Sequence, residues 1–177
     1  MSVTSEKHRE SAPHHLGFHV VTVSTSKFTQ QKAGTYPEDV SGDLITQLVE
    51  QGGYTVAGRS IIPDNPNMIR RLVRTLIKKK DVDVIILTGG TGVTQTDLTI
   101  EAITPLLDKT LPGFGELFRK ISFEKIGTAA VLTRAAAGVA NGKAIFSIPG
   151  SPDSVKTALE ELILPESTHI VKHARER

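Results

Sequence analysis

The chain has 177 residues, of which 38% are hydrophobic and 23% charged, as expected for one globular domain with a sizeable core. A net charge of +2 and an aromatic content of 5% argue against binding to nucleic acid or to a membrane surface. The chain has no cysteine, which excludes disulfides and thiol chemistry, and it has no apolar run long enough for a membrane span, so we expect a cytoplasmic protein.

The N-terminal segment is polar and contains several histidines. We expect residues 1–16 to form an N-terminal arm and residues 17–177 to form a single domain. The apolar stretch 18–23 predicts the first strand, and residues 27–38 are expected to form a loop.

The next segment predicts a helix, a strand and a second helix. Apolar residues recur at helical spacing from Val40 to Val49, and Gly52-Gly53 is a stop signal. Residues 54–62 predict a strand, and Met68 to Ile77 predict an amphipathic helix.

The middle of the chain contains the most apolar strand candidate, residues 81–87. A glycine-rich turn follows, and then a helix is predicted over 98–107. Residues 111–115 are expected to interrupt the pattern before a helix that runs through Phe118.

The C-terminal part predicts a tight turn at Asn141-Gly142, a strand over 144–148 and a helix from Val155 to Ile163. Strands that alternate with amphipathic helices indicate βαβ units. The fold class predicted for the chain is therefore α/β, a three-layer sandwich with a mostly parallel sheet between helices.

The glycine turn is the first candidate site. Thr88-Gly89-Gly90-Thr91-Gly92 follows a buried strand and precedes a helix, so its backbone N–H groups can approach an anion such as a phosphate. The spacing is neither that of a Walker A loop nor that of a dinucleotide fingerprint. The alternative is a tight strand–helix connection without function.

Two aspartates accompany this turn. Asp97 follows it, and Asp64 follows Pro63 at the end of another predicted strand. Taken alone, Asp97 is explained equally well as a helix cap and Asp64 as a turn residue. Carboxylates beside a phosphate are ligands that Mg²⁺ prefers, so we interpret both as catalytic, metal-binding residues.

The other polar turns follow strands that are expected to end at the same sheet edge, where ligands bind in such folds. Ser24, Ser26 and Ser151 offer hydroxyl groups there, although each is also an ordinary turn or cap residue. No residues form a convincing hydrolase triad with them. His169 and His173 have the spacing of a metal-binding pair on a helix, but the absence of a third ligand nearby argues against a site.

The motifs resemble those of one family. The segments are Asp39-Val40-Ser41-Gly42, Leu87 to Gly92 followed by Asp97, Leu111 to Glu116, and Ser147-Ile148-Pro149-Gly150-Ser151-Pro152. In this order they resemble the MogA/MoaB family of molybdenum cofactor biosynthesis, and the MoaB branch in particular. The resemblance extends from about Phe18 to His169.

The resemblance implies a molybdopterin adenylyltransferase that uses ATP and Mg²⁺ and releases pyrophosphate. It implies that Asp64 and Asp97 are catalytic and that the glycine turn binds phosphate. The neighbouring motifs would supply Ser24 on one side and Pro149, Gly150 and Ser151 on the other. It further implies a homotrimer or homohexamer and contact with the downstream metal-insertion protein. Ser26-Lys27 departs from the family pattern.

Two alternatives remain open from sequence. The first is a pterin-binding protein without catalysis, and the second is an interaction domain of the same fold. The pair Asp64 and Asp97 favours the enzyme, because a binder of a polyanion gains nothing from two further negative charges.

Overall fold

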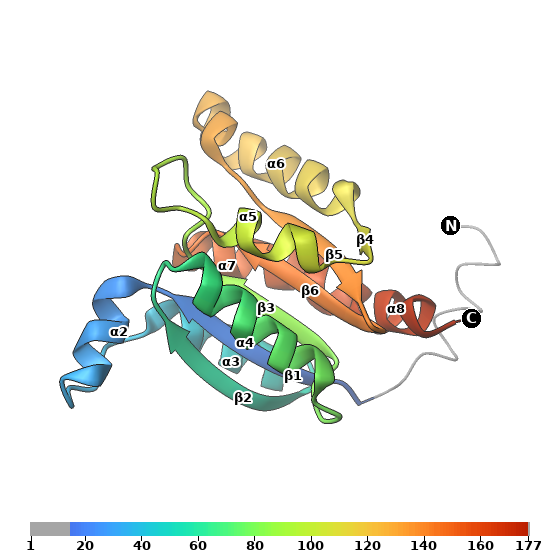
Figure 1. The fold of residues 1–177 in the computed structure, drawn as a ribbon. Helices are drawn as coiled ribbons and strands as arrows, with labels where there is room; N and C mark the ends of the chain where they lie inside the picture. Colours follow the sequence, from blue (N-terminus) through green and yellow to red (C-terminus); the bar gives the residue numbers. More distant parts are fainter. Residues whose placement is uncertain (1–14, 177) are drawn as a thin grey trace.

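The protein is described by a computed structural model, which defines residues 15–176. Its centre is a six-stranded sheet in the order β2-β1-β3-β6-β5-β4 (Figure 1). The strands are β1 (Gly17–Val23), β2 (Thr55–Ile62), β3 (Val84–Thr88), β4 (Lys109–Thr110), β5 (Ala136–Ala140) and β6 (Lys143–Ile148). Strands β2, β1, β3 and β6 are mutually parallel, whereas β5 is antiparallel to β6 and β4 to β5. The predicted α/β class with a mostly parallel sheet is confirmed.

Helices cover both faces of the sheet (Figure 1). On one face, α4 (Pro66–Lys78) and α5 (Thr99–Ile103) pack on one core cluster. On the other, α3 (Val40–Gln51), α6 (Pro112–Ile126) and α7 (Pro152–Ala158) pack on a second cluster. Strands β3 and β6 are buried along their whole length, because each is covered on both faces.

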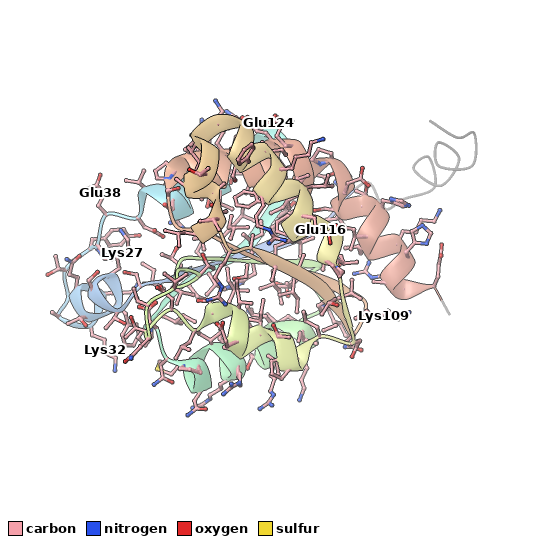
Figure 2. The ribbon with its side chains drawn as sticks, turned by 90° about the horizontal axis from the view of Figure 1, so that it is seen from above. Lys27, Lys32, Glu38, Lys109, Glu116 and Glu124 are labelled. Atoms are coloured by element: carbon pink, nitrogen blue, oxygen red, sulfur yellow. The ribbon has the colours of Figure 1, made fainter. Side chains whose placement is uncertain are left out.

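The prediction of a loop over residues 27–38 is wrong for the first part of this segment, which is helical. Helix α2 (Thr25–Lys32) begins at the N-cap Ser24 and projects from the body of the molecule (Figure 1). It buries no residue, so it has no apolar stripe from which periodicity could reveal it. In Figure 2, Lys27 lies toward Glu38 across the following segment, and its Nζ donates to the Glu38 carbonyl.

Two predictions about the middle of the chain are also corrected. Residues 111–115 do not interrupt a helix, because α6 begins at Pro112, where proline is tolerated at the first helical position. Helix α5 is shorter than predicted: it ends at Ile103, and η1 (Thr104–Leu106) follows it.

Strands β4 and β5 were not predicted. Strand β5 consists of Ala136-Ala137-Gly138-Val139-Ala140, which has one β-branched residue and no aromatic residue, whereas typical strands are rich in both. The predicted turn at Asn141-Gly142 is present and joins β5 to β6, with φ of 49° and 75° at these residues. Positive φ at both positions is the requirement of a type I′ hairpin turn.

The C-terminal region is one continuous helical segment. After α7 it widens into the π-helical turn η3 (Leu159–Ile163) and continues as α8 (Leu164–Arg175). Pro165 lacks an N–H and cannot donate to Glu161, which accounts for the wider turn.

The remaining short element is η2 (Gly127–Leu132), between α6 and β5. Of the expected N-terminal arm, residues 1–14 lie outside the described part, His15 is exposed and Leu16 is buried. No helix within residues 15–176 is long and apolar enough to cross a membrane.

Candidate functional site

The turns after β1, β2, β3 and β6 lie together at the carboxyl edge of the sheet. The Ser24 N–H donates to the Ile62 carbonyl at 2.8 Å, which joins the ends of β1 and β2. The Gly89 N–H donates to the Ile148 carbonyl at 3.1 Å, and Thr88 Oγ1 donates to the Pro149 carbonyl at 3.2 Å. The structure therefore brings together the turns that the sequence singled out.

Glycine is required in the turn after β3 for both conformation and space. Gly89 and Gly90 have φ of 100° and 61°, a region that side chains disfavour. A Cβ on Gly89 would lie 2.4 Å from the Val23 carbonyl oxygen. Gly150 packs against the same residue, since its Cβ would come within 3.4 Å of Gly89 Cα.

Thr99 donates hydrogen bonds to two carbonyl groups of this turn. Its N–H donates to the Gly90 carbonyl and its hydroxyl to the Gly89 carbonyl, both at 2.9 Å. Within residues 15–176, the N–H groups of Gly90 and Thr91 have no hydrogen-bond acceptor. Adjacent backbone N–H groups without protein partners can bind an anion.

Asp64 is fixed by the first residue of α2. Its Oδ2 accepts hydrogen bonds from the Thr25 N–H at 2.9 Å and from Thr25 Oγ1 at 2.8 Å. Its other carboxylate oxygen, Oδ1, lies beside Gly90, where a Cβ would be 2.9 Å away. One oxygen of Asp64 is thus anchored, and the other faces the glycine turn.

Asp97 does not cap a helix. The N-cap of α5 is Leu98, which makes no side-chain cap hydrogen bond, so the capping interpretation is wrong. Instead, Asp97 Oδ2 accepts from the Thr94 hydroxyl at 2.6 Å and from the Thr94 N–H at 2.9 Å. The hydroxyl hydrogen bond is the main cause of a lowered pKa of Asp97, with smaller contributions from the backbone of Thr94 and Gly92 and the charge of Arg134. A lowered pKa keeps this carboxylate ionised at neutral pH.

Both carboxylates therefore lie against the same short turn. A Cβ on Gly92 would be 2.6 Å from Asp97 Oδ2, just as a Cβ on Gly90 would meet Asp64. The two carboxylates are 33 positions apart in sequence, yet they lie beside two glycines that are only two residues apart.

Arg134 is a site residue that sequence reasoning missed. It follows η2 and donates from one guanidinium nitrogen to the Gly92 carbonyl at 2.8 Å, while the other nitrogen pairs with Glu101. A lone arginine in an irregular segment gives no local signal, and its position depends on the path of the chain through η2. It lines a cavity of about 370 Å³ together with Gly89, Gly90, Thr91, Gly92, Asp97, Leu132, Thr133, Pro149, Gly150 and Ser154.

A second, smaller cavity of about 190 Å³ shares Gly89 and Gly150 with the first. It is lined by Thr22, Val23, Ser24, Lys27, Asp39, Ser41, Thr88, Gly89 and Gly150. Asp39 is buried, and it accepts from Thr22 Oγ1 at 2.7 Å and from the Arg59 guanidinium at 3.0 Å. Ser41 donates to the Gly150 carbonyl at 2.6 Å and so fixes the wall between the cavities.

Two expected site residues line neither cavity. Ser151 is the N-cap of α7, where it accepts from the Ser154 N–H and donates to the Ser154 hydroxyl. Asp64 lines neither cavity, and the turn glycine that its carboxylate approaches is Gly90. Ser151 thus caps a helix, as its alternative interpretation has it, and its role in binding stays a prediction.

The arrangement can hold an anion next to a hard cation. Unpaired N–H groups and Arg134 suit phosphate, and carboxylate oxygens suit Mg²⁺. Across the described part of the chain, no three His, Cys, Asp or Glu side chains gather to hold a metal alone. Mg²⁺ is commonly bound by one or two carboxylates plus substrate phosphates, so Asp64 and Asp97 fit such an ion.

Comparison with known proteins identifies the family. Residues 19–169 match the family model described as a probable molybdopterin binding domain. The chain belongs to this family of molybdenum cofactor biosynthesis. The sequence-based recognition is confirmed.

Relatives in the family match along nearly the whole chain. Molybdenum cofactor biosynthesis protein B of Halalkalibacterium halodurans is 44% identical over 94% of this chain and 95% of its own length. A protein of Methanocaldococcus jannaschii named "Probable molybdopterin adenylyltransferase" is 41% identical over 91% of this chain and 95% of its own. The crystal structure of the tungsten cofactor synthesizing protein MoaB from Pyrococcus furiosus superposes with a TM-score of 0.81 at 43% identity, covering 93% of this chain and all of that one.

Proposed function

We propose that this protein transfers the adenylyl group of ATP to the terminal phosphate of molybdopterin, with Mg²⁺ as the cation. The observation that carries the proposal is that the Asp64 carboxylate lies beside Gly90 and the Asp97 carboxylate beside Gly92, two glycines of the same candidate anion-binding turn. The name of the Methanocaldococcus jannaschii relative supports it.

In the proposed reaction, a phosphate oxygen of molybdopterin attacks the α-phosphorus of ATP. The bond from that phosphorus to the bridging oxygen of the β-phosphate breaks, and pyrophosphate leaves with the electron pair. A phosphate monoester is already anionic near neutral pH, so the reaction needs no general base. This agrees with the site, in which the residues that line the two cavities include no histidine.

The residues of the chain then have separate roles. The N–H groups of Gly90 and Thr91 and the guanidinium of Arg134 bind and orient phosphate oxygens. Asp64 and Asp97 would hold Mg²⁺, which when bound neutralises negative charge on the phosphate of the transferred adenylyl group. Thr25 and Thr94 fix the two carboxylates before substrate arrives.

A measurement of pyrophosphate release with molybdopterin, ATP and Mg²⁺ tests the proposal. We expect Asp64→Asn and Asp97→Asn each to reduce turnover by orders of magnitude while the fold stays intact. Asp81→Asn is the matched control, because this exposed carboxylate precedes β3 at the opposite end of the strand. Full activity in either site variant would remove that residue from the mechanism.

The second candidate is a molybdopterin-binding protein without catalysis. The specific observation in its favour is that both aspartates have threonine partners, as purely structural turn residues would. Tight pterin binding without pyrophosphate release would select this candidate over the enzyme.

We also propose self-association into a trimer or hexamer, and contact with a downstream metal-insertion protein. The support for self-association is that several large apolar side chains of α6 and η2 are exposed, namely Leu117, Phe123, Ile126, Val131 and Leu132. Light scattering on a Phe123→Lys variant tests this, since a charge there should dissociate the assembly.

A further inference from the structure

We propose a second metal site, remote from the glycine turn, in which His169 and His173 of α8 together bind a first-row transition-metal cation such as Ni²⁺ or Cu²⁺. The pair lies in a hollow of about 470 Å³ lined also by Asp108, Gly142 and Glu176. Gly142 precedes β6, so the hollow is at the opposite end of that strand from Pro149 and Gly150.

The two imidazole rings converge on each other. Their Nε2 atoms are 2.9 Å apart, and the ring centroids are separated by 4.6 Å at an interplanar angle of 66°. This follows from their spacing, because residues four apart lie on the same face of a helix. Both side chains are partly exposed, at 30% and 45%, so an ion can reach them from solvent.

A carboxylate orients each ring through its other nitrogen. Glu166 Oε2 is 3.2 Å from His169 Nδ1, and Glu176 Oε2 is 2.7 Å from His173 Nδ1. An ionised carboxylate can only accept a hydrogen bond, so these contacts favour the tautomer with the proton on Nδ1. That tautomer leaves a lone pair on Nε2, the nitrogen that can then bind a metal.

The contact between the two Nε2 atoms suits a metal ion that bonds to both. Two lone pairs that face each other at this distance repel, and either a proton shared between them or a metal ion bonded to both removes the repulsion. Two nitrogens each about 2.05 Å from a metal and separated by this distance subtend about 90° at it. That is the angle between neighbouring ligands in tetragonal or octahedral ions, which favours Cu²⁺ or Ni²⁺ over tetrahedral Zn²⁺.

In the sequence, the absence of a third ligand near the two histidines argued against a metal site. Within residues 15–176, no third His, Cys, Asp or Glu side chain joins the pair to form a metal-binding group. The structure adds the two carboxylates that orient the rings and an open hollow where water can complete the coordination. The site therefore predicts a loosely held, exchangeable ion rather than a structural metal.

Calorimetric titration of the full chain with Ni²⁺, in the presence of excess Mg²⁺, tests the proposal. We expect one equivalent to bind, and binding to be lost in His169→Gln and in His173→Gln. Glu176→Ala should weaken binding about tenfold, because it keeps both ligands but removes the acceptor that fixes the ring of His173. His15→Gln, which changes an exposed histidine outside the pair, is the matched control.

Thermal unfolding provides a readout that is independent of the titration. Ni²⁺ should raise the Tm of the wild type and leave that of His169→Gln unchanged, and the Tm without metal verifies that the variant folds. Undiminished Ni²⁺ binding by His169→Gln would place the ion elsewhere and overturn the proposal. Absence of Ni²⁺ binding by the wild type would also overturn it and leave a shared proton as the bridging cation.

Discussion

The Oδ1 atom of Asp64 lies so close to Gly90 that a Cβ on this glycine would be only 2.9 Å from it. The same Cβ would be 2.5 Å from Thr99 Oγ1, which donates to the Gly89 carbonyl. Gly90 is therefore the point at which the turn, one catalytic candidate and the start of α5 meet.

Gly90→Val should weaken molybdopterin binding and destabilise the protein. The added side chain would displace Asp64 or Thr99, and φ of 61° at this position disfavours any Cβ. We expect a loss of stability of about 1–3 kcal/mol in urea unfolding, and lower affinity in a pterin titration. Gly113→Ala is the control, because no atom lies within 4 Å of a Cβ there. Unchanged pterin affinity in Gly90→Val would contradict the anion-binding role of the turn.

Thr94→Val should shift the acid side of the activity profile to higher pH. The Thr94 hydroxyl is the main cause of the lowered pKa of Asp97, so its removal raises that pKa. The carboxylate is then protonated, and unable to hold Mg²⁺, at a higher pH than in the wild type. The dependence of kcat/KM on pH and an NMR titration of the Asp97 carboxyl carbon measure the effect. Thr94→Ser keeps the hydroxyl and should behave as the wild type, and a common pH profile for all the proteins would exclude Asp97 from the step observed.

Arg134→Lys should impair the reaction although the positive charge remains. A lysine ammonium cannot reproduce the fork that contacts both the Gly92 carbonyl and Glu101. Loss of one charge-assisted hydrogen bond, about 1.5–3 kcal/mol, corresponds to a fall in kcat/KM of about tenfold or more. Steady-state kinetics of Arg134→Lys measure the fall in kcat/KM. Lys156→Arg is the control, because Lys156 is an exposed residue of α7. Equal kinetics in both variants would leave Arg134 with a purely structural role.

The lowered pKa of His19 predicts that the protein loses stability in mild acid. Burial is the main cause that lowers its pKa to about 4, and the charge of Lys79 lowers it further. Between pH 6.5 and about 4 the unfolded chain binds a proton that the folded chain does not, so the free energy of unfolding falls as the pH falls through this window. The loss is of the order of 3 kcal/mol when the pH reaches the folded pKa.

Urea unfolding at several pH values measures the effect of His19. His19→Gln should flatten the dependence between pH 6.5 and 4, because it removes the titrating ring, whereas Ser60→Ala removes only the hydroxyl 2.9 Å from His19 Nε2 and should retain the slope. An equally steep dependence in His19→Gln would assign the acid sensitivity to other groups.

Periodicity predicted the elements that are buried on a regular pattern and missed those that are not. The strands Val84–Thr88 and Lys143–Ile148 were expected because their burial requires apolar residues. Helix α2 buries nothing, and β5 contains mainly alanine and glycine, so neither has a pattern that hydrophobicity can detect. Gly115 was read as an interruption, whereas in α6 its missing side chain allows approach to the Ala135 carbonyl.

The candidate site was predictable in part for a similar reason. The glycine turn and Asp64 follow strands directly, so the sheet determines where they lie. The hydrogen bonds from Thr25 and Thr94 and the approach of Arg134 depend on side-chain geometry across loops, which no local sequence pattern encodes.

Because α2 contributes no buried side chain to either core, it can open locally while both cores stay packed. Thr25, which anchors Asp64, is its first residue. Amide hydrogen exchange in α2 should therefore be faster than in β3, and ligands that engage Asp64 should slow it. A helix outside both cores would thus report directly on occupancy of the site.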